Sequence, residues 1–303
     1  MRKLTEKEIF LLEDQGCLAE DWANIEVDAD EFKTNNIFNV RFYGKIQIGS
    51  LNGRIDMEEG FALKCGIRNA TLKDVVIGDC CLIDNVYGYI SNYEIGDGVL
   101  ISNVGVMTTQ GCPNYGTGNS VAVLNEAGDG NIVIYDQLTA QTAQLMMDNQ
   151  SVYNVIRREQ EQRPKPATGV VGTGSRICAT KEICNVMIGE ACEIQGTSKI
   201  EECTILSSEV APTLIGHDVI MENTVVSFGA NVSAGAKLDN SFVGESVHVG
   251  KGYSSESTVM FSNTYLDNGE SCAAFLGPFS CSHHKASLLI AGKFSFYNAG
   301  SST

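Results

Sequence analysis

The residues best suited to chemistry gather near the end of the chain. Two adjacent histidines, His283 and His284, lie in a segment that also supplies hydroxyl, amine, phenol and amide side chains. These neighbours are Ser280, Ser282, Lys285, Tyr297 and Asn298. An imidazole titrates near neutral pH, so it can act as a general base toward an acceptor hydroxyl or amine. The segment therefore predicts a catalytic site.

Consecutive residues of a strand point to opposite faces, so only one member of the pair is expected to face a given site. We predict that His283 or His284 is the base and that Ser280 or Asn298 orients the acceptor. Lys285 and Tyr297 are the other predicted substrate-binding residues. The competing interpretation is an exposed His-His-Lys loop without catalytic function.

The remaining two histidines carry weaker signals. His217 follows an Ile-Gly pair and His248 lies between two valines, so we interpret both as structural or solvent-facing. Apart from the adjacent pair, the histidines are far apart, and neighbours on one strand diverge too much to chelate one ion. The sequence therefore predicts no metal site, and it contains no signal for a tightly bound cofactor.

Two further motifs have competing interpretations. Gly116-Thr117-Gly118 is a candidate phosphate cradle, but it lacks the lysine and the following helix of a P-loop, and a plain turn is the alternative. The vicinal pair Cys80-Cys81 suggests redox chemistry, yet small thiols are also common core residues. The favoured interpretation is structural in both cases.

Composition narrows the functional classes. The net charge of −16 argues against nucleic acid or an anionic membrane as the main partner. The first residues, 1–10, lack the apolar core of a signal peptide, and no stretch approaches transmembrane length. Eleven cysteines in a chain without a secretory signal indicate reduced thiols. We therefore expect a cytoplasmic protein.

A six-residue period runs through residues 75–110. Large apolar residues recur at every sixth position, namely Ile77, Ile83, Tyr89, Ile95, Ile101 and Met107. A helix repeats its apolar face every three to four residues and a strand every two, so neither explains this spacing. A chain that turns a corner after each short strand does explain it, and this is the signature of a β-solenoid.

The same period returns after residue 171. One series begins at Ile188, Ile194 and Ile200 and resumes at Ile215 and Met221, followed by Ser227 and Ser233. Beside it runs a second apolar series, formed by Ile220, Val226, Val232 and Leu238. The pattern predicts two inward-facing columns and indicates that both repeat blocks build one fold.

The segment between the blocks does not repeat. Residues 121–124 and 132–135 are β-rich runs separated by a Gly-Asp-Gly turn, which predicts a hairpin. A helix is expected over 137–162 because Pro164 stops it. Its apolar seam follows a spacing of four and three, through Leu138, Thr142, Leu145, Asn149, Val152 and Ile156. This seam packs either on the solenoid or on a neighbouring subunit, and the sequence leaves both open.

The chain thus divides into four parts. Residues 1–35 are expected to form a capping arm, with a helix over 6–15 that begins at a Thr5–Glu8 capping box. Residues 36–110 are the first repeat block, 111–170 the inserted hairpin, helix and linker, and 171–303 the second block.

These repeats resemble those of the hexapeptide-repeat transferases. The resemblance implies a left-handed parallel β-helix, a trimer, and one histidine base in a groove between adjacent subunits. The order of helix, repeats, insertion and the ending SHHKASLLIAG resembles the N-terminal part of a bacterial family of long hexapeptide-repeat proteins. That likeness implies that repeats continue beyond Thr303.

The combined expectation is an all-β solenoid that transfers an acyl group. The resemblance implies acyl-CoA as co-substrate and a sugar or nucleotide sugar as acceptor, with no nucleic acid or membrane partner. The alternative is a non-catalytic solenoid that binds a ligand or serves as a scaffold. CoA binding without turnover would favour the second interpretation.

Overall fold

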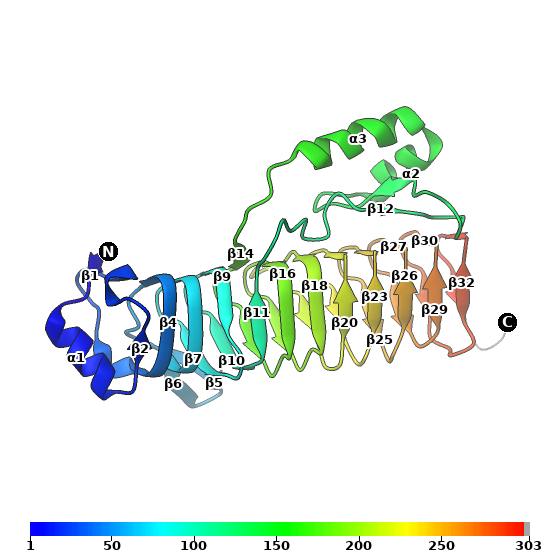
Figure 1. Cartoon of the computed structure of the whole chain (residues 1–303). Helices are drawn as coiled ribbons and strands as arrows, with labels where there is room; N and C mark the ends of the chain where they lie inside the picture. The colour runs from blue at the N-terminus through cyan, green and yellow to red at the C-terminus, as the bar shows by residue number, and fades with distance from the viewer. Residues whose placement is uncertain (300–303) are drawn as a thin grey trace.

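The chain winds into a parallel β-solenoid, which Figure 1 shows as a long stack of coils. The structure is a computed structural model that describes residues 1–299. Thirty strands form one continuous sheet, and each coil pairs in parallel with the coils on either side of it. Stacked residues of adjacent coils are commonly 17 or 18 apart in sequence. This is the fold class that the repeat predicts.

Three stacks of short strands form three faces, here named A, B and C. Face A contains β8 (Leu82–Val86), β10 (Leu100–Val104), β15 (Arg176–Cys178), β17 (Glu193–Gln195), β19 (Leu214–Ile215), β22 (Asn231–Val232), β25 (His248–Gly250), β28 (Tyr265–Asp267), β31 (Cys281–Ser282) and β34 (Asn298–Ala299). Face B contains β2 (Leu18–Ala19), β11 (Val106–Thr108), β20 (Ile220–Glu222), β23 (Lys237–Asp239), β26 (Ser254–Glu256), β29 (Glu270–Cys272) and β32 (Leu288–Ile290).

Face C contains β3 (Ile25–Val27), β14 (Gly169–Val171), β21 (Val225–Val226), β24 (Phe242–Val243), β27 (Val259–Met260), β30 (Phe275–Leu276) and β33 (Lys293–Phe294). Longer strands bend across corners and serve more than one face. These are β4 (Ile37–Ile48), β7 (Gly66–Ile77), β9 (Ile90–Ile95), β16 (Glu182–Ile188) and β18 (Lys199–Ile205).

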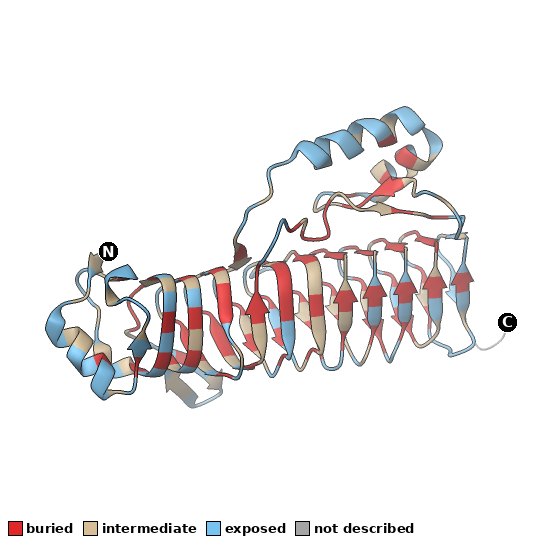
Figure 2. Ribbon diagram, in the orientation of Figure 1, coloured by how far each residue is buried: buried red, intermediate tan, exposed pale blue. Residues whose placement is uncertain are grey.

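The interior is filled by one large side chain from each strand. In Figure 2 the buried residues form bands across the strands of the solenoid. In the second block these side chains are mostly separated by two steps of six residues and one of five around each coil, so a strict count of six drifts. Tyr89 is 41% exposed, and Ile90 is the residue that points inward. The placement of Tyr89 in the core was therefore wrong.

The same drift corrects the second block. Met221, Val226, Val232 and Leu238 are all buried and succeed one another around the coil, whereas Ile220 is only partly buried. Two parallel columns of inward residues were predicted. The structure instead has a single series of inward residues whose spacing is not constant. The cause is that one side of each coil is a residue shorter than the other sides.

Asparagine residues form several corners because their side chains tolerate left-handed backbone conformations. Asn39, Asn69, Asn85 and Asn103 have φ values of 52°, 49°, 58° and 55°. Their amides are stacked and hydrogen-bonded from coil to coil over 2.9, 3.4 and 3.2 Å. Each side-chain amide thus forms a hydrogen bond with the amide of the next coil, and these bonds hold the coils in register.

The N-terminal helix forms as the sequence predicts. Thr5 caps α1 (Glu6–Asp14) by accepting from the Glu8 backbone N–H, and the Glu8 carboxylate accepts from the Thr5 backbone N–H. The solenoid, however, begins before residue 36. β2 and β3 already pair in parallel with β4, and β1 (Arg2–Lys3) pairs antiparallel with β3. The arm therefore supplies part of the first coil.

Two excursions leave the coils. A small hairpin of β5 (Arg54–Glu58) and β6 (Phe61–Lys64) projects from the first block and was not predicted. The larger excursion is the insertion between the blocks, which contains the predicted hairpin as β12 (Ser120–Val121) and β13 (Ile132–Val133). In Figure 1 this insertion lies along one side of the second block.

The insertion packs on face C. The outward residues Val225, Phe242, Val259 and Phe275 join the hairpin and helices in a second hydrophobic core. The helical part is two helices, α2 (Ala140–Asp148) and α3 (Gln150–Gln162), because Asn149 caps α3 by accepting from the Ser151 N–H. The single helix expected over 137–162 was wrong.

The helix face also differs from the expected seam. Ala143, Met146 and Tyr153 are buried, whereas Leu145 is 56% exposed. The break at Asn149 changes the helix direction, so a seam counted straight through it does not stay on one side. The insertion therefore packs through part of the expected seam, namely Leu138, Val152 and Ile156, together with Ala143, Met146 and Tyr153. Leu145 and Asn149 lie outside this packed face.

Candidate functional site

Face A carries a polar patch on its last coils. In the register of the sheet, His248 on β25 stacks on Tyr265 on β28, which stacks on Cys281 on β31. Beside this column, Gly250 pairs with Asp267. The intervening residues Val249, Leu266 and Ser282 are fully buried, so their neighbours in the strand point outward. We call His248, Tyr265, Asp267, Cys281 and His283 the histidine patch.

A histidine–carboxylate pair lies at the centre of this patch. His248 Nε2 is 3.1 Å from Asp267 Oδ1, and Lys251 Nζ is 2.5 Å from Asp267 Oδ2. The side chain of Asp267 is only 1% exposed, while that of His248 is 24% exposed. Burial acts to raise the pKa of Asp267, but hydrogen bonds from Lys251 and His248 outweigh it and hold the pKa below its ordinary value. Asp267 is therefore a carboxylate at neutral pH.

A glycine makes room for this pair. A Cβ atom at Gly250 would lie 2.8 Å from His248 Nε2 and 2.9 Å from Asp267 Oδ1. Both distances are shorter than a methyl group tolerates, so any side chain here would displace the imidazole or the carboxylate. Gly250 thus permits a close approach between residues of two coils.

Aromatic rings extend the patch along the solenoid. The rings of His248 and Tyr265 are stacked with centroids 4.2 Å apart, and the Tyr265 and His283 centroids are 5.0 Å apart. His283 Nε2 lies 2.8 Å from the Cys281 thiol. Burial raises the pKa of that thiol, with Asp267 adding to the effect, so Cys281 is a thiol and not a thiolate nucleophile.

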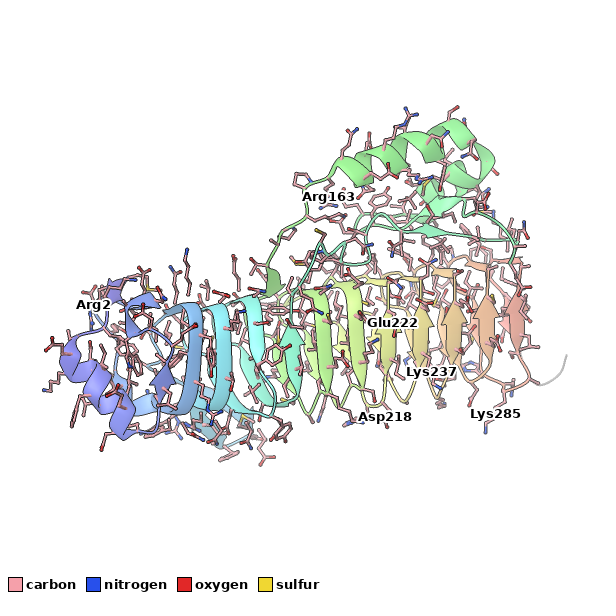
Figure 3. The ribbon with its side chains drawn as sticks, viewed as in Figure 1. Arg2, Arg163, Asp218, Glu222, Lys237 and Lys285 are labelled. Carbon is pink, nitrogen blue, oxygen red and sulfur yellow. The ribbon has the colours of Figure 1, made fainter. Side chains whose placement is uncertain are left out.

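A shallow hollow of about 270 Å³ borders the patch. It is lined by Lys251 and Lys285 together with Asn268 and Glu270. Figure 3 shows Lys285 projecting from the edge of the solenoid near its C-terminal end. Lys251 is already paired with Asp267, so Lys285 is the ammonium group at this hollow that suits an anionic group of a ligand. Lys251 lines the hollow and pairs with Asp267, which in turn bonds the imidazole of His248.

The site residues that were predicted from the sequence do not all lie in one place in the structure. His283 joins the patch, and His284 is exposed at the following turn. Ser280 is buried and donates to the Gly277 carbonyl oxygen over 2.9 Å, so its hydroxyl stabilises a turn and does not face a ligand.

The remaining predicted residues lie near the last described coil. Asn298 is exposed and stacks in register on Cys281. Tyr297 packs against Phe294, with ring centroids 5.3 Å apart. Lys285 lines the hollow described above. Asn298 and Lys285 are thus available to a ligand on face A, whereas Tyr297 is partly engaged in packing.

The His248–Asp267 pair was not predicted from the sequence. His248 was interpreted as structural or solvent-facing, and Asp267 was not considered. No sequence motif links them, because they belong to different coils and meet only through the sheet register. The available signal was the glycine in Val-Gly at 249–250, at an outward position next to a histidine.

The other candidates of the sequence have structural explanations. The amides of Gly116, Thr117 and Gly118 donate to Asn114 Oδ1, the Asn114 carbonyl and the Ile134 carbonyl. They are therefore not free to bind phosphate. All eleven cysteines are free thiols. Within residues 1–299 no group of three metal-ligating side chains is present, and no helix has the length and apolarity to cross a membrane.

Fold and site together define a β-solenoid protein with a histidine–aspartate pair on an open face. The chain belongs to the family described as "Domain of unknown function (DUF4954)", whose model matches residues 1–303. A relative from Treponema pallidum (strain Nichols), described as "Uncharacterized protein", is 28% identical over 248 residues. That alignment covers 76% of this chain and 34% of the relative, so the chain spans about a third of the relative's length.

Two solved structures match over most of this chain. A UDP-N-acetylglucosamine acyltransferase from Campylobacter jejuni matches with a TM-score of 0.22 and 11% identity, over 89% of this chain and 71% of that chain. LpxA from Acinetobacter baumannii matches with a TM-score of 0.22 and 11% identity, over 89% and 70%. Both TM-scores are low, so the fold assignment rests on the strand pairing.

Proposed function

We propose that the protein transfers an acyl group from a CoA-type thioester to a hydroxyl or amine of a sugar or nucleotide sugar. The observation that carries the proposal is the His248–Asp267 pair, in which a buried carboxylate orients an imidazole on an open face. An orienting partner of this kind holds a catalytic histidine in one tautomer and stabilises its protonated form.

The tautomer determines which nitrogen acts as base. Because Asp267 accepts a hydrogen bond from His248 Nε2–H, the lone pair for catalysis is on Nδ1. Nδ1 takes the proton of the acceptor as the acceptor atom attacks the thioester carbonyl. The new bond to the acyl carbon forms, the carbon–sulfur bond breaks, and the imidazolium returns the proton to the departing thiolate.

Other residues of the patch fit the same reaction. Lys285 at the adjacent hollow suits a phosphate group of a CoA-type donor or a nucleotide sugar. The Tyr265 ring provides an apolar surface beside the imidazole. His283 is the alternative base, but its Nε2 already contacts the Cys281 thiol, which favours His248.

The second candidate is a ligand-binding or scaffolding solenoid without catalysis. It is favoured by the bond between Lys251 and Asp267, since a carboxylate shared by two cationic groups also serves as a purely structural ion network. A homotrimer with the patch at a subunit boundary is a further part of the proposal and is measurable by light scattering.

The test is a screen of acyl-CoA donors and sugar-nucleotide acceptors, run beside a CoA-binding assay. His248→Ala is expected to lower turnover at least a hundredfold, the usual contribution of a general base. Gly250→Ala is expected to lower turnover at least tenfold because its methyl group separates His248 from Asp267. His284→Ala is the matched control and should stay within twofold of the parent.

Each result has a defined meaning. A large loss in His283→Ala with none in His248→Ala would move the base to His283. CoA binding without turnover would favour the non-catalytic solenoid. Neither binding nor turnover in the longest natural form of the protein would contradict acyl transfer altogether.

A further inference from the structure

A second hollow lies on the other side of the molecule, beneath the linker that closes the insertion. Residues 163–168, here named the strap, connect α3 to β14 and pass over a corner of the solenoid, as Figure 1 shows. Between the strap and the coils is a hollow of about 280 Å³. Its floor is apolar and is built by Met187 and Leu206, whereas the side chains of Ile188 and Ile205 at this edge belong to the solenoid core. Such a floor favours an apolar ligand body.

Two cationic side chains of the strap stand at this hollow. Arg163, labelled in Figure 3, is paired bidentately with Asp136 over 2.7 and 2.8 Å. Lys165 is partly buried and donates to the Thr117 carbonyl oxygen over 3.3 Å and to the Thr117 hydroxyl. In the part of the chain that the structure describes, Lys165 forms no salt bridge.

Positive charge therefore exceeds negative charge around the hollow. Arg163 and Lys165 bring two positive charges to its wall, and Asp136 brings one negative charge. Burial, with the nearby Arg163 charge, lowers the pKa of Lys165, and the Asp136 carboxylate offsets this only in part. This is unexpected in a protein with a net charge of −16. An anionic group beside Lys165 would supply the missing charge.

We propose that the hollow under the strap binds a small amphiphilic anion, a molecule with one carboxylate or phosphate group and a short apolar chain. Lys165 binds the anionic group, and the chain lies on Met187 and Leu206. The Arg163–Asp136 pair holds the strap across the hollow and leaves Lys165 as the cation available to the ligand. This site is separate from the histidine patch on face A and does not depend on the acyl-transfer proposal.

Calorimetric titration of the purified protein tests the site with defined probes. Octanoate and octyl phosphate supply the two anionic groups, octanol supplies the chain without charge, and acetate supplies the charge without a chain. We expect octanoate or octyl phosphate to bind at least tenfold more tightly than octanol or acetate. Within a series from butanoate to octanoate, affinity should rise about two- to fourfold for each methylene that becomes buried.

Variants identify the residue responsible. Lys165→Gln should weaken octanoate binding at least tenfold and leave octanol binding unchanged, while Lys165→Arg should retain most of the affinity. Lys181→Gln removes the same charge from an exposed position outside the hollow and serves as the control. A thermal melt of each variant shows whether it is folded.

The outcomes separate clearly. Tight octanoate or octyl phosphate binding that Lys165→Gln abolishes and Lys181→Gln does not would support the site. Absence of binding for both anions at millimolar concentration would overturn it. Equal affinity for octanol and octanoate, or equal losses in Lys165→Gln and Lys181→Gln, would also overturn it, because the binding would then not depend on Lys165.

Discussion

Faces A and C of the same coils present opposite surfaces. On β24, Phe242 is buried against the insertion with Phe261, their ring centroids 5.6 Å apart. On β25, the next side of the same coil, His248 faces outward and pairs with Asp267. The inward neighbours Val243 and Val249 are both fully buried. One face thus serves packing and the other remains open to ligands.

The comparison teaches that a solenoid separates stability from surface chemistry. Inward residues of every face join one continuous core, so they are restricted to apolar or small side chains, Ser255, Ser271 and Ser282 being the small polar ones. Outward residues are free of that restriction, and each face acquires its own character from them. Four predictions test this separation, beginning with the shared core on which both faces depend.

The largest effect is expected in the shared core. Ile101 is fully buried, so Ile101→Asp places a carboxylate among stacked apolar side chains and should unfold the first block. Ile101→Ala should cost about 2–5 kcal/mol of unfolding free energy. Thermal denaturation followed by circular dichroism measures both. Ser102→Asp, one residue later and pointing outward, is the control, and an equal loss there would show that the assigned register is wrong.

The second effect concerns face C alone. Phe242→Ala removes a ring that is buried under the insertion and should cost about 3–5 kcal/mol. The matching change on face A, Tyr265→Ala, removes a ring that is 38% exposed and should cost less than about 1 kcal/mol. Urea denaturation of both variants gives the comparison. Similar losses would mean that the two faces do not differ as described.

The third effect is a pH dependence on face A. The pKa of Asp267 is lower in the folded protein, so its ionised form adds stability above the ordinary aspartate pKa of about 4. That contribution is lost as the pH falls through the folded-state value. The parent should therefore exceed Asp267→Asn by about 1–2 kcal/mol near neutral pH, and the difference should shrink below about pH 4. A pH-independent difference in denaturation midpoints would contradict this ionic contribution.

The smallest effect is expected on the outer side of the insertion. Leu145 is exposed, so Leu145→Lys should change the stability by less than about 0.5 kcal/mol, whereas the buried Met146→Ala should cost about 2–5 kcal/mol. Thermal melts at two protein concentrations separate packing from assembly. A loss in Leu145→Lys that appears only at high concentration would place this helix face at a subunit contact.

Several features followed from local sequence alone. The recurrence of Ile77, Ile83, Ile95 and Ile101 predicts a solenoid because each side of a coil places one apolar residue in the core. The Thr5–Glu8 capping box predicts the start of α1 because both hydrogen bonds form within four residues. The hairpin at β12 and β13 follows from β-rich runs around a turn.

Other features were decided only by the tertiary structure. Which residue points inward, Tyr89 or Ile90, depends on whether the step from the buried Ile83 is six residues or seven, and coil stacking determines that length. His248 meets Asp267 because the sheet register places β25 against β28, and Gly250 leaves the space between them. Lys165 likewise reaches Thr117 from the far end of the insertion. Such contacts join residues distant in sequence, so no local pattern encodes them.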